Sequence, residues 1–168
     1  MKDKYIFREI KKEEIPQMFE LILARMKWMD EKGIKQWNVT YYDEVYPMSY
    51  YEEARQKGIL YVLEKAETGE IVCGAVLKEE DDRWPDDGVA VYLHNFATKI
   101  GEKGIGAYFL QCVEAYAIEK KKDSFRLDSA IDNEGLTKYY EEKGFLPVGT
   151  CVDGLYEGIL REKKLKKE

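Results

Sequence analysis

The sequence predicts an α/β fold of the α+β type, with a mixed, mainly antiparallel sheet of about seven strands flanked by about four helices. Short apolar or alternating segments of strand type are interleaved with segments of helical apolar spacing along the whole chain. Three of the predicted strands follow one another directly before a crossover helix, which favours antiparallel hairpins. A doubly wound nucleotide-binding sheet is excluded, because its glycine loop follows the first strand, whereas the glycine cluster here follows the fourth.

The first third of the chain predicts one strand and two helices. Alternating apolar and polar residues predict a strand over Tyr5–Ile10. A helix ended by Gly33 follows, because apolar residues recur there at helical spacing: Ile15, Phe19, Ile22, Met26 and Met29. A shorter helix is predicted over Met48–Gln56, with Gly58 just beyond it. The aromatic stretch 34–46 between these helices has no clean period.

The remainder alternates strands with two further helices. Strands are predicted over Ile59–Lys65, Ile71–Lys78, Val89–Thr98, Ser124–Ile131, Phe145–Val152 and Leu155–Glu162, and helices over Ile105–Lys120 and Gly135–Lys143. The dipeptide Asp153-Gly154 is typical of a hairpin turn, so we expect the last two strands to pair antiparallel. The basic end REKKLKKE is predicted to be a solvated tail.

Size, charge and cysteine content exclude several classes of protein. A chain of 168 residues fits one domain over 1–168, and a net charge of −6 without a strong basic face argues against nucleic-acid binding and mildly favours cationic small molecules. No apolar leader or membrane-length run is present, so we expect a cytoplasmic protein that does not bind membranes. Three widely spaced cysteines, Cys73, Cys112 and Cys151, argue against a disulfide framework and a metal site, and predict reduced core thiols.

The stretch GEKGIGAYF at 101–109 places glycines where the predicted fourth strand meets a helix. A helix N-terminus presents unpaired N–H groups and the positive end of the helix dipole, and glycines there allow a phosphate to approach. Lys103 adds a positive side chain. A pyrophosphate cradle is therefore one interpretation, and a simple turn with a helix cap is the other. A P-loop is excluded, because no Gly-Lys-Ser/Thr follows.

This strand–turn–helix resembles the signature of the GNAT superfamily of acetyl-CoA-dependent N-acetyltransferases, an Arg/Gln-x-x-Gly-x-Gly/Ala turn between the fourth strand and the following helix. Gly104 and Gly106 match it, and Gly101 stands where the family has Arg or Gln. A second family pattern is matched in NEGLTKYYEEKGF by Asn133, Leu136, Tyr140, Gly144 and Phe145. The predicted order of elements is also that of the GNAT fold, so the resemblance covers essentially the whole chain.

The resemblance implies acetyl-CoA as cofactor, with its pantetheine arm between splayed fourth and fifth strands. Asn133 would contact the arm through its side chain, and the alternative is a helix N-cap. The other implied contacts are made by the backbone: Phe96, Ala97 and Thr98 would pair with the arm, and the amides of Glu102, Lys103, Gly104, Ile105, Gly106 and Ala107 would hold the pyrophosphate.

Two residues are candidates for proton transfer. Tyr140 matches the family's general acid, which protonates the departing thiolate; the alternative is a tyrosine packed on the core. The family's carboxylate base aligns near Tyr92, and His94, the only histidine, lies two residues on and therefore on the same strand face. Histidine's ordinary pKa of about 6.5 suits a base. A structural histidine, with water as the base, is the alternative.

The acceptor pocket of the family is commonly built from the first two helices, their loop and the last hairpin. Trp28, Trp37 and Tyr41 lie in that region, and Tyr92 is added from the fourth strand. Aromatic faces attract cations, which fits an amine. The alternative is that the tryptophans anchor a loop onto the core.

The combined prediction is an acetyl-CoA-dependent N-acetyltransferase, monomeric or homodimeric, that acetylates a primary amine of a small molecule by direct attack in a ternary complex. An enzyme acting on peptide or protein amines is one alternative. Two further alternatives are a non-catalytic acyl-CoA-binding or sensor module and a structural domain whose glycine turn binds nothing.

Overall fold

A computed structural model describes residues 2–166, which form seven strands and five α-helices. The strands are β1 (Tyr5–Glu9), β2 (Leu60–Lys65), β3 (Ile71–Lys78), β4 (Ala90–Thr98), β5 (Ser124–Ala130), β6 (Leu146–Asp153) and β7 (Tyr156–Lys164). The helices are α1 (Ile15–Lys32), α2 (Tyr42–Val45), α3 (Met48–Gln56), α4 (Ile105–Glu119) and α5 (Glu134–Glu142), with a 3₁₀ turn, η1 (Lys12–Glu14), before α1. Each predicted element is present, and α2 is an addition within the aromatic stretch.

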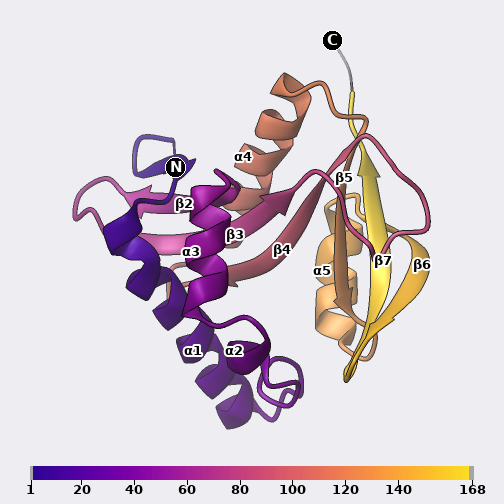
Figure 1. Cartoon of the computed structure of the whole chain (residues 1–168), viewed down its shortest axis with the longest axis horizontal. Coiled ribbons are helices and arrows are strands. Elements are labelled where there is room, and N and C mark those ends of the chain that lie inside the picture. The colour runs from indigo at the N-terminus through magenta and orange to yellow at the C-terminus, as the bar shows by residue number, and fades with distance from the viewer. Residues whose placement is uncertain (1, 167–168) are drawn as a thin grey trace. The chain divides into compact units, whose positions relative to one another are not determined.

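The strands form a mixed sheet in the order β1-β2-β3-β4-β5-β7-β6 (Figure 1). The pairs β1/β2, β2/β3, β5/β7 and β6/β7 are antiparallel, whereas β4 pairs with β5 in parallel. The predicted α+β fold with a mainly antiparallel seven-stranded sheet is therefore confirmed. Gly154, with φ of 60°, makes the predicted turn between β6 and β7.

The chain forms two compact units, each built from two stretches of sequence. The first unit contains the residues up to Leu77 and Asn95–Cys112, and the second contains Lys78–His94 and the residues from Val113 on. Strand β4 and helix α4 thus each contribute to both units. The prediction of a single domain stays a prediction.

In the first unit, α1 and α3 bury one face each in a shared core with β2. Met18 and Ile22 of α1, Tyr51 of α3 and Val62 of β2 are fully buried there. Burying a large apolar side chain stabilises a fold by roughly 1.5–3 kcal/mol, so the apolar spacing of α1 positions the helix. Gly33 ends α1 in the left-handed region at φ 71°, as its place in the sequence predicts.

Asn95 gives β4 a local irregularity inside the first unit. Its φ is 56°, in the left-handed region, and its side chain is 7% exposed. Its Nδ2 donates to the hydroxyl of Tyr42 at 2.7 Å, and its Oδ1 accepts from the hydroxyl of Tyr50 at 2.8 Å. Asparagine tolerates this backbone region better than most residues, so the two hydrogen bonds hold β4 to the segment that carries α2 and α3.

Asn95→Ala is expected to unfold more easily than Asn95→Gly, by about 1 kcal/mol, because both lose the tyrosine hydrogen bonds but only alanine keeps a Cβ in the left-handed region. Denaturant unfolding of the two variants measures this difference directly. Equal unfolding free energies would show that the backbone conformation at this position costs nothing.

The second unit contains a charged side chain that corrects one prediction. Arg161 is fully buried, and its guanidinium donates to Ser129 Oγ at 2.9 Å and to Thr137 Oγ1 at 3.0 Å. The expectation that REKKLKKE forms a solvated tail is therefore wrong for its first residues, since β7 continues to Lys164. Residues 167 and 168 of that segment lie outside the described residues.

The three cysteines are free thiols. Cys73 and Cys151 are buried and Cys112 is half-buried. Burial raises the pKa of Cys151 to about 11, which keeps it in the unreactive thiol form near neutral pH. Within residues 2–166, no helix combines the length and the apolar character that crossing a membrane requires.

Candidate active site

The glycine turn of the first unit forms the N-terminus of α4. Gly101 and Gly104 adopt φ of 94° and 78°, where L side chains are strained. The carbonyl of Gly104 accepts from the N–H of Tyr108 at 3.2 Å, so Gly104 caps the helix. The amides of Ile105, Gly106 and Ala107, in the first turn, consequently have no partner within the helix. This geometry is compatible with both interpretations of the sequence, the simple turn with a helix cap and the pyrophosphate cradle, because both involve the same amides.

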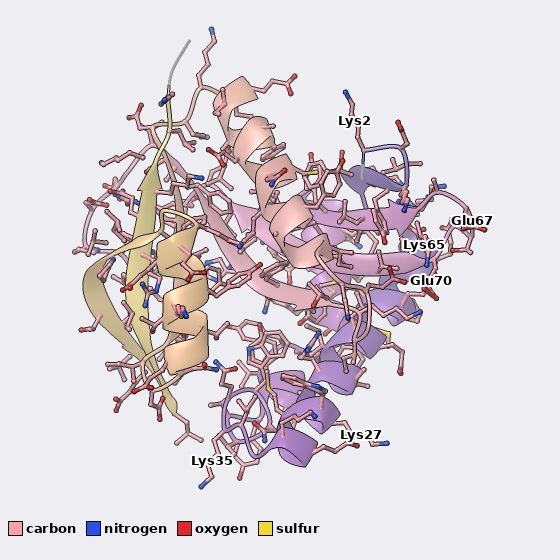
Figure 2. All side chains as sticks on the ribbon, turned by 180° about the vertical axis from the view of Figure 1, so that it is seen from behind. Lys2, Lys27, Lys35, Lys65, Glu67 and Glu70 are labelled. Carbon is pink, nitrogen blue, oxygen red and sulfur yellow. The ribbon has the colours of Figure 1, made fainter. Side chains whose placement is uncertain are left out.

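The charges around this turn favour an anion. The first turn of α4 carries no acidic residue, and Lys103 and Gly104 are exposed. The carboxylate of Glu102 accepts from Lys65 Nζ at 2.9 Å and from the Tyr5 hydroxyl at 2.8 Å, and these bonds lower its pKa. Lys65 lies at the edge of the turn that joins β2 to β3, near Glu67 and Glu70 (Figure 2). The negative charge of Glu102 is thus already paired.

The structure modifies the predicted backbone contacts at two places. The N–H of Glu102 donates to the Lys99 carbonyl at 3.3 Å, so this amide is engaged within the turn. The carbonyl and Oγ1 of Thr98 both accept from Arg25 Nη2 at 2.9 Å. Ala97 is buried, and the ring of Phe96 is half-buried. The amides that remain for an anion are therefore those that follow Glu102.

In the second unit, the parallel pairing of β4 with β5 stops early. It comprises three residue pairs, from Ala90 with Ser124 to Tyr92 with Arg126, although β5 runs on to Ala130. Leu93 and His94 continue β4 beyond these pairs. This end of pairing agrees with the strand separation that the resemblance implies.

Tyr140 lies on α5 with its ring in the core of the second unit. It is 7% exposed, and its ring meets the ring of Phe145 at 5.9 Å between centroids. Burial, with the neighbouring Tyr139 and Asp128, raises the pKa of Tyr140 well above its ordinary value. Its hydroxyl has no hydrogen-bond partner among the residues that the structure describes. Tyr140 therefore keeps its phenol proton, and its hydroxyl donates no hydrogen bond to another described residue.

Asn133 is the N-cap of α5. Its Oδ1 accepts from the N–H of Leu136 at 3.0 Å, which is the alternative interpretation that the sequence left open. A side chain amide has two ends. The Nδ2 group of Asn133 stays available for a ligand while the oxygen caps the helix.

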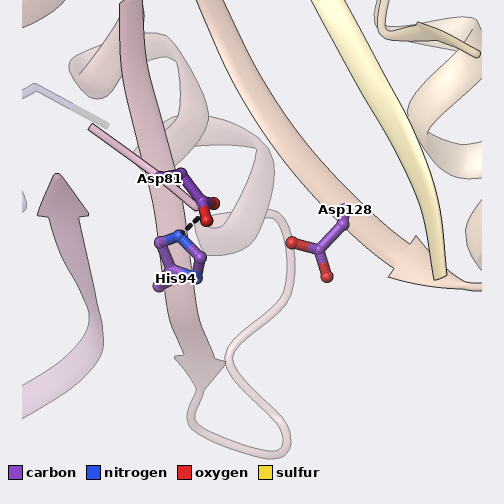
Figure 3. A group of neighbouring side chains, drawn as sticks. All are labelled: Asp81, His94 and Asp128. Carbon is purple, nitrogen blue, oxygen red and sulfur yellow. Dashed lines mark hydrogen bonds and ion pairs between the residues drawn. The ribbon is translucent and has the colours of Figure 1, made fainter. Parts of the chain in front are cut away.

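His94 belongs to a group of polar side chains in the second unit that we call the His94 cluster: Asp81, Arg83, His94, Asp128 and Tyr156. His94 Nε2 and Asp81 Oδ2 lie 2.7 Å apart, and the side chains are only 9% and 8% exposed (Figure 3). The carboxylate of Asp128 points toward this pair, and one polar atom from each of the three lies within 4.8 Å of the others. Asp128 in turn accepts from the Tyr156 hydroxyl at 2.6 Å and from Arg83 Nη1 at 3.2 Å.

The electrostatics of the His94 cluster suit proton transfer better than metal binding. Burial on its own would raise the pKa of Asp81, but the hydrogen bonds from His94 and from the Arg83 backbone outweigh it, so that pKa is lowered. Burial and Asp128 raise the pKa of Tyr156, which keeps its proton. A divalent cation bound by His94 and both carboxylates would lie beside the Arg83 guanidinium, and two positive groups oppose each other there.

Sequence reasoning identified His94 but missed both carboxylates of this cluster. Asp81 lies in the polar loop EEDDRWPDDG, which contains six acidic residues that the sequence does not distinguish, and Asp128 lies in a strand. Only the fold shows which acidic side chain faces the histidine.

The predicted acceptor residues have different surroundings within their own units. Trp37 stacks on Tyr42 at 4.4 Å between centroids with an interplanar angle of 12°, and it packs against the core of the first unit. This favours the alternative in which it anchors the loop. Trp28 is half-buried beneath the guanidinium of Arg25, at 4.7 Å, and Tyr41 is 62% exposed.

Tyr92 is a core residue of the second unit, which corrects its predicted place in a substrate pocket. It is 1% exposed, its hydroxyl accepts from Arg126 Nη1 at 3.0 Å, and its ring meets Trp84 edge-on. The physical reason is the loop between β3 and β4, whose Trp84 packs over this part of the strand. A cavity of about 350 Å³ lies beside that loop, and its walls combine Asp82–Asp86 with Arg126, Val148–Thr150, Leu160 and Glu162.

Comparison with solved structures identifies the fold. A GNAT-family acetyltransferase from Listeria monocytogenes 4b F2365 superposes with a TM-score of 0.76 at 22% sequence identity, over 96% of this chain and 95% of that one. The chain has the GNAT acetyltransferase fold. No family model matches the sequence, and no curated protein matches it.

Two further GNAT-fold structures carry ligands. The PaiA N-acetyltransferase from Thermoplasma acidophilum, in complex with coenzyme A, gives a TM-score of 0.71 at 19% identity, over 95% of this chain and 98% of that one. The NatC complex bound to Gag peptide and CoA gives a TM-score of 0.69 at 12% identity, over 97% and 99%. At these identities the GNAT fold is what the comparisons establish.

Proposed function

We propose that this protein is an acetyl-CoA-dependent N-acetyltransferase that acetylates a primary amine of a small molecule by direct attack in a ternary complex. The observation that carries the proposal is the Gly104-capped first turn of α4, whose amides are open and whose surroundings favour an anion. The GNAT fold, with PaiA bound to coenzyme A, supports the same use of this turn. We further propose a cytoplasmic monomer or homodimer.

The residues of the turn fit the pyrophosphate of acetyl-CoA. Amides of residues 103–107 would hold the phosphates, with the Lys103 side chain as an additional cation. Phe96, Ala97 and the Asn133 Nδ2 group would contact the pantetheine arm. When bound, acetyl-CoA supplies an electrophilic thioester carbonyl and a thiolate leaving group.

Two side chains of the second unit would move the protons. An amine reaches the enzyme as an ammonium ion and must lose a proton before it can attack, and His94 would take that proton. Tyr140 would supply a proton, or a hydrogen bond, to the departing sulfur, since burial keeps its phenol protonated. The remaining alternative is that bulk water, and not His94, acts as the base.

A small cationic amine is the acceptor that the charges favour. The protein carries a net charge of −6, and the His94 cluster contains two carboxylates against one guanidinium. A peptide amine is the second candidate, because the NatC complex of the same fold is bound to a peptide. Release of free thiol from acetyl-CoA, measured across a panel of polyamines, amino acids and peptides, discriminates the two.

Acetyl-CoA is expected to raise the melting temperature. A ligand at 100 times its dissociation constant adds about 2.7 kcal/mol, or roughly 5–10 °C for a chain of this size. Melting curves with acetyl-CoA and with free acetate make the comparison. No shift at saturating acetyl-CoA would leave the glycine turn as a simple cap and remove the proposal.

Gly106→Glu is expected to abolish most of that shift without destabilising the free protein. Glutamate in the first turn suits the helix dipole but repels a pyrophosphate. The matched control is Gln111→Glu, which makes the same charge change at an exposed position further along α4 and should keep the shift. Equal shifts in both variants would place the cofactor elsewhere.

A further inference from the structure

We propose that Asp81 is a positioning residue that fixes the tautomer of His94, so that Nδ1 is the atom that accepts the proton of the incoming amine. This inference rests on the proposed role of His94 as the base. It adds a residue that lies outside the glycine turn and outside the second sequence motif.

Asp81 is held in a single orientation by two hydrogen bonds of different kinds. Its Oδ1 accepts from the backbone N–H of Arg83 at 2.9 Å, which closes a turn in the loop before β4. Its Oδ2 faces His94 Nε2 at 2.7 Å. Oδ1 therefore stabilises the loop, and Oδ2 bonds the imidazole.

The protonation state of the pair follows from donor and acceptor rules. Asp81 is an ionised carboxylate near neutral pH, because its pKa is lowered, and an ionised carboxylate only accepts. Nε2 must then carry the proton of the hydrogen bond. A neutral imidazole has one N–H and one lone pair, so the lone pair lies on Nδ1. Nδ1 has no hydrogen-bond partner among the residues that the structure describes.

The remaining polar groups of the His94 cluster leave Nδ1 available. The carboxylate of Asp128, which points toward the pair, accepts from Tyr156 and Arg83. Cys151, also near these charges, keeps its proton because burial raises its pKa to about 11. Asp81, Asp128, Arg83, Tyr156 and Cys151 are titratable groups of this region, and of these Asp81 bonds the ring directly.

The proton step balances on these atoms. An N–H bond of the acceptor ammonium breaks, the nitrogen keeps the electron pair, and an N–H bond forms at His94 Nδ1. The imidazolium that results is stabilised by the carboxylate of Asp81 through Nε2–H. The Nδ1 proton then passes to water, which restores the neutral ring.

The direct test is the nitrogen-15 spectrum of histidine-labelled protein. The chain has one histidine, so both ring-nitrogen signals belong to His94, and their couplings to the carbon-bound ring protons distinguish Nδ1 from Nε2. Spectra recorded over a pH series, up to the range where the ring is neutral, should show a protonated Nε2 and an unprotonated Nδ1. The reverse pattern, or an equal mixture of tautomers, would overturn the inference.

Asp81→Asn is expected to invert the tautomer. The amide oxygen must stay on the Arg83 N–H, because turning the amide over would set two donors against each other, so the NH₂ group faces Nε2. Nε2 must then accept, and the proton moves to Nδ1. Asp82→Asn is the matched control: it makes the same charge change on the adjacent, exposed residue and should leave the spectrum unchanged.

Kinetics then separate this inference from the proposed function. With the amine that releases thiol fastest in the acceptor panel, Asp81→Asn should lower kcat about 10- to 100-fold with little change in KM, and Asp81→Glu should recover part of it. An inverted tautomer with unchanged kcat would refute Asp81 as a positioning residue in catalysis. Full activity of His94→Gln would refute the base assignment itself, while the wild-type spectrum would still report whether Asp81 orients the ring. An unchanged tautomer in a folded Asp81→Asn variant would refute the orientation.

Discussion

Tyr140→Phe is expected to lower kcat for acetyl transfer by about 10²-fold or more, with the dissociation constant for acetyl-CoA changed less than about twofold. The variant keeps the ring that packs on Phe145 and removes only the hydroxyl. That hydroxyl has no hydrogen-bond partner among the described residues, so its loss leaves no structural group unpaired. Steady-state kinetics and calorimetric titration of acetyl-CoA measure the two quantities.

The matched control is Tyr139→Phe, which removes the same atom from the adjacent, half-buried tyrosine. It should retain turnover, since the spacing to Gly144 and Phe145 assigns the acid to Tyr140. Because burial raises the pKa of Tyr140, the wild-type hydroxyl keeps its proton at neutral pH, and its ionisation should not limit turnover there. Wild-type turnover by Tyr140→Phe, with intact acetyl-CoA binding, would favour a non-catalytic acyl-CoA-binding module.

Arg126→Met is expected to be the most destabilising of these substitutions, by up to about 3–5 kcal/mol at neutral pH, because it removes the buried cation of Glu162 and leaves that carboxylate paired with the exposed Lys164. The side chain of Arg126 is 8% exposed and that of Glu162 is 9% exposed, and Arg126 Nε donates to Glu162 Oε2 at 2.6 Å. The guanidinium also lies over the ring of Trp84, at 4.3 Å. Methionine retains part of the packing, so the loss reports mainly on charge.

The loss of unfolding free energy in Arg126→Met should change with pH in a defined direction. Burial would raise the pKa of Glu162, but Arg126 and Lys164 outweigh it and lower that pKa in the folded protein. The pair therefore stabilises the wild type above the ordinary carboxyl pKa, and this stabilisation is lost as the pH falls through the lowered value. The deficit of Arg126→Met should accordingly shrink below about pH 4, where Glu162 is protonated in the variant.

Denaturant unfolding at neutral and acidic pH measures both effects. Arg55→Met is the control, since Arg55 pairs with Glu52 one turn away on the surface of α3, and such pairs contribute little. A deficit of Arg126→Met that is constant with pH would show that packing against Trp84, and not the ion pair with Glu162, is what is lost.

Local sequence signals predicted most elements of the fold. Apolar spacing and Gly33 fixed α1, the boundaries predicted for α3 are those observed, and α4 differs at its end by one residue. Helix periodicity, glycine stops and turn dipeptides act within a few residues, so they are visible without a fold. The short helix α2 has too few residues to show a period.

The features that were missed depend on residues far apart in sequence. Alternation placed Tyr92 and His94 on one strand face, but whether that face is open depends on the loop that carries Trp84. The partners of Arg161 come from β5 and α5, so its burial could not be seen in a basic C-terminal run. Asp81 is one acidic residue of a polar loop until the fold brings it to His94.

Strand β4 and helix α4 each contribute residues to both units, and this affects how the protein can fold while it is synthesised. The first unit lacks its last stretch until Cys112 has left the ribosome, and the second cannot be completed before β7 emerges. No single cut of the chain yields either unit whole, because each has a stretch of the other inserted between its parts. Nascent chains must therefore hold an incomplete first unit while the residues from Lys78 to His94 are made, and contacts between such distant segments slow folding. Fragments that end at Leu77 or at His94 should accordingly give less folded protein on expression than the full chain does.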